Sequence, residues 1–181
     1  MISYNVGLRD VPDAMRFMDD LRSRLANRVQ LTTDGHKAYL TAVNEAFGGD
    51  VDYAMLVKLY TSGPKQQHAE GHKYSPGECC GTRKRKIAGN PVRKDISTSY
   101  VERMNLNIRM GNRRFTRLTN AFSKKVENHV HALAIYFMHY NFGRIHQTLR
   151  VTPAMQAGLT EHVWSLEEIA ALSNQNELAT T

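Results

Sequence analysis

One acid stands among seven bases in residues 96–125, "ISTSYVERMNLNIRMGNRRFTRLTNAFSKK". The acid is Glu102. A carboxylate in this setting can hold Mg²⁺ against a polyanion, because Mg²⁺ prefers oxygen ligands and shares them with phosphates. A second interpretation is also open. Ser99 and Glu102 have the spacing of a capping box, in which the glutamate bonds back to the Ser99 amide at the start of a helix.

The residues after Glu102 favour the metal interpretation. Glu102, Asn105 and Arg109 are spaced i, i+3 and i+7, which predicts one polar face of a helix, and Arg113 continues that face. A carboxylate at one end of a basic face suits a metal ion beside a DNA backbone. Such an ion can activate a nucleophile and stabilise the leaving oxygen in phosphoryl transfer.

Asp34 is the second candidate acid. It follows the segment "RVQLTT", which predicts a short strand, and ligands of α/β sheets bind at the carboxyl ends of strands. The alternative is a turn aspartate before Gly35, which is a common arrangement.

The charge distribution favours a nucleic-acid partner. The chain of 181 residues has a net charge of +7. Residues 82–125 hold thirteen Lys or Arg against two acids, a net of +11, so the rest of the chain is mildly acidic. A basic block on an acidic body is typical of DNA-binding proteins, although a solvated basic surface is the plainer alternative.

The order of predicted elements indicates an α/β layer fold that positions these acids. The sequence has no apolar run of the roughly 18 residues that a membrane helix needs and no signal peptide, so a bacterial cytoplasm is expected. Strands are predicted at 2–6, 28–35 and 51–59, helices from Asp10 and at 36–48, and a long basic loop at 61–95. Helices follow, starting near Ser99, Ser123, Thr152-Pro153 and the capping box Ser165–Glu168.

Three stretches together resemble the catalytic part of bacterial insertion-sequence transposases of the DDE, RNase H-like superfamily, closest to the insertion-sequence-one type. They are "LTTDGHKAYL", "STSYVERMNLNIRMGNRRFTRLTNAFSKK" and "YNFGRIHQTLRVTPA", and they cover most of residues 29–158. The resemblance implies an RNase H-like mixed sheet flanked by helices, incomplete at the N-terminus. It implies a core fragment at 1–122 and a helical C-terminal part of the same domain at 123–181.

The resemblance also implies roles for residues. Asp34 and Glu102 become the family's second and third catalytic acids, ligands of Mg²⁺ or Mn²⁺. Transposon ends and target DNA become the partners, with other copies of the chain, near the nucleoid. The residues implied to hold DNA are Asn105, Arg109, Arg113, Arg114, Arg117 and Lys124.

One departure from the family pattern limits the expected activity. The family's first aspartate lies upstream of the strand that "ISYNVG" resembles, so a truncated copy that is inactive by itself is expected. A non-catalytic DNA-binding protein is the alternative. His68, His72, Cys79 and Cys80 have poor spacing for zinc, and Arg83 to Lys86 suit either a phosphate clamp or a basic tether.

Overall fold

The computed structural model describes residues 1–60, 79–116 and 119–178. The chain forms two compact units. One consists of Ile2–Met104, and the other of Met1 with Asn105–Thr181. The predicted boundary at residue 122 within one domain stays a prediction.

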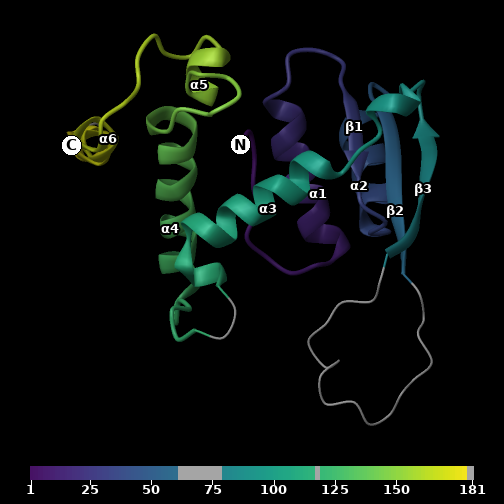
Figure 1. The fold of residues 1–181 in the computed structure, drawn as a ribbon, viewed down its shortest axis with the longest axis horizontal. Helices are drawn as coiled ribbons and strands as arrows, with labels where there is room; N and C mark the ends of the chain where they lie inside the picture. The colour runs from purple at the N-terminus through teal and green to yellow at the C-terminus, as the bar shows by residue number, and fades with distance from the viewer. Residues whose placement is uncertain (61–78, 117–118, 179–181) are drawn as a thin grey trace. The chain divides into compact units, whose positions relative to one another are not determined.

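A three-stranded sheet forms the centre of the Ile2–Met104 unit (Figure 1). Its strands are β1 (Gln30–Thr33), β2 (Asp52–Tyr60) and β3 (Cys79–Ala88), in that spatial order. β1 pairs with β2 in parallel, and β2 pairs with β3 in antiparallel fashion. The expected α/β class with a mixed sheet flanked by helices is therefore confirmed.

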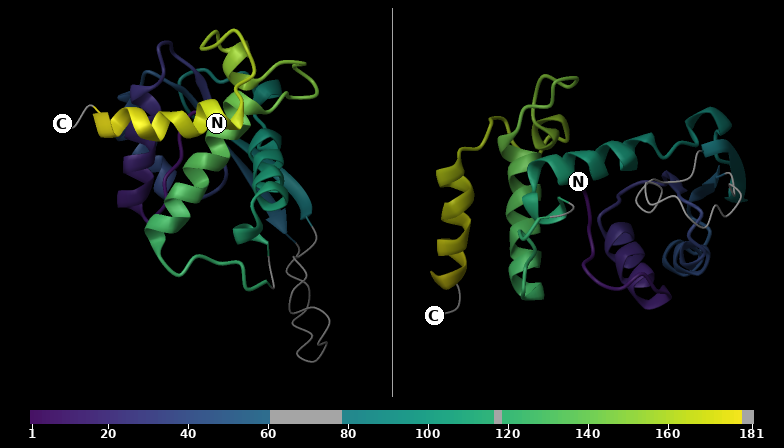
Figure 2. Two further views of the ribbon diagram at one scale, coloured as in Figure 1. Left: turned by 90° about the vertical axis from the view of Figure 1, so that its left-hand side faces the viewer. Right: turned by 60° about the horizontal axis from the view of Figure 1, so that its bottom comes forward.

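Helices α1 (Val11–Ser23) and α2 (Ala38–Phe47) cover one face of this sheet (Figure 2). Their buried residues include Met18 and Val43, which pack with Tyr53 and Met55 of β2. Asp10 caps α1 as predicted, since its carboxylate accepts from the Asp13 amide. This packed face is the main core of the unit.

The opposite face of β2 carries a smaller core. Because side chains alternate along a strand, Ala54 and Leu56 point away from α1 and α2. They pack against Ile96, which is 1% exposed and follows the short helix η2 (Arg93–Asp95). The chain then enters α3 (Ser99–Gly111). Ile96 thus fixes the start of α3, the helix that carries Glu102, against the sheet.

The unit containing Asn105–Thr181 is helical. Its elements are η3 (Arg113–Phe115), α4 (Val126–Met138), η4 (His139–Gly143), α5 (Pro153–Gln156) and α6 (Leu166–Leu178). Two predicted helix starts are confirmed. The Thr152 hydroxyl accepts from the Met155 amide, and Ser165 and Glu168 bond each other's backbone amides in a capping box. The predicted Ser123 cap is wrong: α4 begins after Lys125, and the Ser123 hydroxyl accepts from Arg114 instead.

The strand predicted at 2–6 is also wrong, because this segment joins no sheet. Its polar residues hold it instead. The buried Ser3 hydroxyl donates to Asp20 of α1, and the Asn5 side-chain amide donates to Asp13, while Ile2 is 60% exposed. Side-chain bonds to a helix have replaced the backbone ladder that the alternation predicted.

The long loop predicted at 61–95 contains the strand β3. Residues 61–78 lie outside the described part of the chain. The strand was missed because its sequence, "CCGTRKRKIA", lacks the apolar alternation of a half-buried strand. As an edge strand with most side chains exposed, β3 takes its stability from hydrogen bonds to β2.

Candidate functional site

The Glu102 carboxylate is held at a single oxygen. The Lys58 ammonium of β2 lies 2.6 Å from Oε1, and the Thr98 hydroxyl donates to the same atom at 2.7 Å. Among the described residues, Oε2 receives no hydrogen bond. The side chain of Glu102 is 48% exposed, so the carboxylate lies at the surface.

The capping-box interpretation of Glu102 is wrong. The Ser99 amide donates to the Ser97 hydroxyl at 3.2 Å, and that hydroxyl donates to the Ser99 hydroxyl. At the start of α3, the Ser97 hydroxyl therefore accepts the hydrogen bond from the Ser99 amide that the capping-box pattern assigned to Glu102. The carboxylate is released for the ion pair with Lys58.

The ion pair shifts the pKa of both partners. The hydrogen bond from Lys58 lowers the pKa of Glu102, with a further contribution from the Thr98 hydroxyl. In return, Glu102 raises the pKa of Lys58. Each charge of the pair therefore favours the ionised form of its partner.

Asp34 lies immediately after β1, where a ligand of an α/β sheet is expected. One carboxylate oxygen accepts from the His36 amide at 3.0 Å, which is the turn geometry of the plainer interpretation. The other lies 3.9 Å from the Arg9 guanidinium, and the side chain is 56% exposed. Burial raises the pKa of Tyr53, and the charge of Asp34 adds to that rise.

Strand register relates the two acids. Thr33 is paired with Met55, and a Cβ on Gly35 would touch Val57, so the intervening Asp34 lies at the level of Leu56. Lys58 follows two residues later, which corresponds to roughly 7 Å along the strand. The two acids share no partner, however, and Asp34 is not among the groups that shift the pKa of Glu102. Direct sharing of one ion by Asp34 and Glu102 stays a prediction.

The donor chemistry of these two residues fits Mg²⁺ or Mn²⁺. Both are exposed carboxylates, the hard oxygen ligands that these ions prefer, and Glu102 already binds a cation at one oxygen. Within the described residues, no group of three or more His, Cys, Asp or Glu side chains could hold a metal ion. Any ion at Asp34 and Glu102 would take its remaining ligands from water or from a phosphate.

The predicted DNA-binding residues lie in the Asn105–Thr181 unit. Those described, namely Asn105, Arg109, Arg113, Arg114 and Lys124, are all exposed. Arg109 donates through Nε to the Asn105 carbonyl, and Arg114 donates to Ser123. Arg117 lies outside the described residues. The structure therefore leaves these side chains accessible to phosphates.

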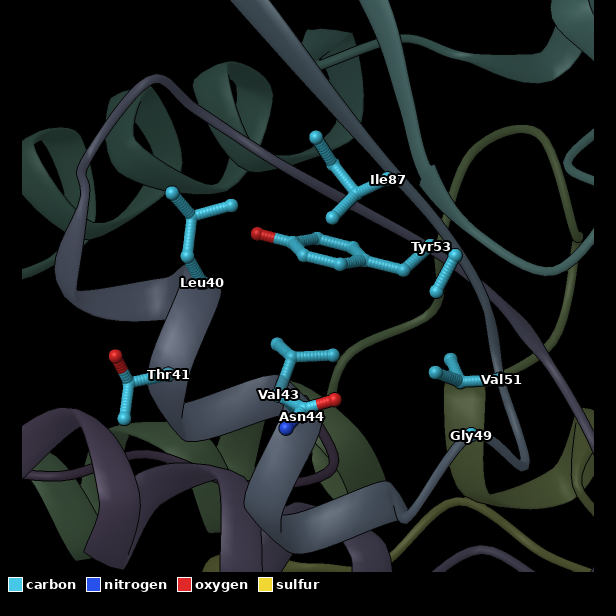
Figure 3. A pocket seen from close by; sticks show the side chains of 9 residues that line it. Leu40, Thr41, Val43, Asn44, Gly49, Val51, Tyr53 and Ile87 are labelled. Atoms are coloured by element: carbon cyan, nitrogen blue, oxygen red, sulfur yellow. The ribbon is translucent and has the colours of Figure 1, made fainter.

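A pocket of about 360 Å³ lies away from both acids, on the α2 face of the sheet. Figure 3 shows the Tyr53 ring lying between Ile87 and Val43, with Leu40 beside it. Neither Asp34 nor Glu102 lines this pocket. It is lined by polar and apolar side chains, Thr41 and Asn44 among them, and is not part of the candidate site.

Lys58 is the site residue that sequence reasoning missed. In "DYAMLVKLY" it was one polar residue near the end of a strand. The available signal was the alternation of side chains along the strand. By this alternation Lys58 lies on the same face of the sheet as Ala54 and Leu56, and Tyr53 and Met55 lie on the other face. Lys58 is therefore on the face that Ile96, just before α3, packs against.

Cys79 and Cys80 are exposed free thiols at the start of β3. Within the described residues, the Cys79 thiol donates to the Gly81 carbonyl and the Cys80 thiol donates to the Leu59 carbonyl, both weak contacts through sulfur. His68 and His72, which were weighed with them as zinc ligands, lie outside the described residues.

Comparison with known proteins gave no relative. No family model matches the sequence, no curated protein matches it, and no solved structure matches the fold. Among the described helices, none combines the length and the apolar character needed to cross a membrane.

Proposed function

We propose that the chain has the function of a DDE-type transposase: metal-dependent DNA cleavage and strand transfer on an RNase H-like core. One observation carries the proposal. Glu102 is anchored through Lys58 to β2, the strand that pairs in parallel with the strand preceding Asp34, and among the described residues its Oε2 receives no hydrogen bond. The resemblance of three segments to such transposases, with the basic block around Glu102, supports it.

The proposed roles follow from the contacts. Asp34 and Glu102 would hold Mg²⁺, which when bound supplies a Lewis acid beside the scissile phosphate. Lys58 and Thr98 orient Glu102 by occupying Oε1, and the His36 amide orients Asp34. The exposed arginines after Glu102 would position the DNA backbone, since guanidinium groups bind phosphate with two parallel hydrogen bonds.

Mn²⁺ titration followed by NMR tests the site without requiring activity. Paramagnetic Mn²⁺ should broaden the signals of Asp34 and Glu102 together at low occupancy. Asp34→Asn and Glu102→Gln should each abolish the broadening at both positions. Glu45→Gln, on the exposed surface of α2, is the matched control and should change nothing. Broadening at neither acid, or at each acid independently, would remove the shared metal site.

Lys58 also favours a second candidate function, a non-catalytic DNA-binding protein derived from a transposase. An ammonium bound to the third acid gives Glu102 a structural partner in place of a metal. Nicking of supercoiled DNA separates the two functions. Nicking that needs Mg²⁺ or Mn²⁺ and is lost in both Asp34→Asn and Glu102→Gln supports the transposase, whereas DNA binding without such nicking supports the second candidate.

A further inference from the structure

The edge strand β3 carries four consecutive basic residues, Arg83 to Lys86. Its neighbour on one side is β2, and no described strand pairs with its other side. Because side chains alternate along a strand, the four bases divide into two pairs on opposite faces of the sheet. The structure gives these two pairs different surroundings.

The lysines donate hydrogen bonds to residues that follow β3. Lys84 and Lys86 lie opposite Leu56 and Ala54. The Lys84 ammonium donates to the Arg93 carbonyl at 3.0 Å, and the Lys86 ammonium donates to the Asn90 side chain at 3.3 Å. Both lysines therefore fasten the turn that follows β3.

Arg83 and Arg85 make no comparable hydrogen bonds within the described residues. Arg83 and Arg85 lie opposite Val57 and Met55, and both are exposed. Within the described part of the chain, neither guanidinium makes a hydrogen bond or an ion pair. Their attachment points are about 7 Å apart along one face, as for any two alternate residues of a strand.

Four described acids of the same unit pair with other cations. Asp50 and Asp52 bind Arg28, Asp34 faces Arg9, and Glu102 is bound by Lys58. Arg83 and Arg85 are thus two neighbouring guanidinium groups on one face of a strand, and neither forms a salt bridge with an acid in the described residues. Guanidinium is the group best suited to phosphate, because its planar fork matches phosphate oxygens.

We propose that Arg83 and Arg85 form a phosphate-binding pair through which β3 binds the DNA backbone. The inference rests on the DNA-binding part of the proposed function and adds a surface in the Ile2–Met104 unit. Two charges on one strand face can contact successive phosphates but read no bases, so this surface contributes affinity without sequence preference.

The test compares two charge-matched double variants of the full chain. Binding of a fluorescent random-sequence duplex is measured by anisotropy between 50 and 200 mM salt. Arg83→Gln/Arg85→Gln should lower the log–log salt slope by about 2 and weaken binding at 100 mM by roughly tenfold to a hundredfold. Arg22→Gln/Arg24→Gln removes the same charge from the C-terminal end of α1, where aspartates already pair both groups, and should leave the slope unchanged.

A third variant separates charge from geometry. Arg83→Lys/Arg85→Lys keeps both charges and should retain the slope, while losing affinity because an ammonium lacks the guanidinium fork. Equal melting temperatures would show that all variants fold. The inference is overturned if the wild type has a steep slope that the Gln double variant retains. If the Gln double variant retains the slope and also self-associates, the role of the two arginines is instead to keep an exposed strand edge from pairing with another chain. A flat slope in the wild type itself refutes the proposed function.

Discussion

Ile96→Ala should loosen the face of the sheet that carries Glu102. Ile96 is 1% exposed and packs on Ala54 and Leu56, six residues before Glu102. The substitution removes three carbon atoms, worth about 0.8 kcal/mol each, and leaves a cavity that adds to this cost. Because the cluster is small and can partly collapse, we expect a loss of about 2.5–3 kcal/mol in the free energy of unfolding.

Urea unfolding and thermal melting measure this effect. A loss of this size lowers the melting temperature of a chain of this length by roughly 5–12 °C. Ile96→Val should cost only about 1 kcal/mol. Leu8→Ala, at a position that is 76% exposed in the same unit, should stay within about 0.5 kcal/mol of wild type.

The variant should also change Glu102. If Ile96 fixes the approach to α3, then Ile96→Ala should move the Glu102 pKa back toward its ordinary value as the contact with Lys58 weakens. A carboxyl NMR titration reports this pKa. A stability within about 1 kcal/mol of wild type, with an unchanged Glu102 pKa, would refute the view that Ile96 anchors the site.

Three other perturbations test separate contacts. Arg109→Ala should lower the magnitude of the salt slope of DNA binding by about 1, measured by anisotropy, and an unchanged slope would exclude a phosphate contact. A hydrogen bond from Arg28 lowers the pKa of Asp52 to about 2, with help from a backbone amide. Because the pKa of Asp52 is lowered, its carboxylate stabilises the fold above pH 3.8, and this stabilisation is lost as the pH falls toward 2. In urea unfolding, the difference in the free energy of unfolding between wild type and Asp52→Asn should therefore shrink between about pH 4 and pH 2. A difference independent of pH would contradict this. In Gly111→Ala the new Cβ would lie 2.6 Å from the Tyr136 ring, so the melting temperature should fall, and it should fall less in a Tyr136→Leu background. Equal falls in the two backgrounds would show that contact with the ring is not the cause.

Local signals in the sequence predicted local structure well. The Asp10, Thr152 and Ser165 caps were correct because each depends on bonds within one helical turn. Asp34 was correctly placed at the carboxyl end of a strand because "QLTT" and the following Asp-Gly mark a strand end, although the strand itself stops at Thr33. These features need no knowledge of the rest of the fold.

Signals that depend on distant partners failed. The alternation at Ile2 and Tyr4 predicted a strand, but Ser3 and Asn5 found acids on α1. The ion pair between Lys58 and Glu102 joins residues whose contact depends on how the chain returns to the sheet after β3. No pattern near Glu102 could reveal it, and the capping-box spacing at Ser99 pointed to the wrong bond.

The connectivity of the sheet has a consequence for the order of folding. Each strand pair joins neighbours in sequence: 22 residues separate Gln30 from Asp52, and 19 separate Tyr60 from Cys79. The contact from Lys58 to Glu102 spans 44 residues and forms only on a strand already in place. Because closing longer loops costs more entropy, the sheet should assemble before the start of α3 docks on it. In pulse-labelled refolding, β2 amides would then gain protection from exchange earlier than the amides of the first turn of α3.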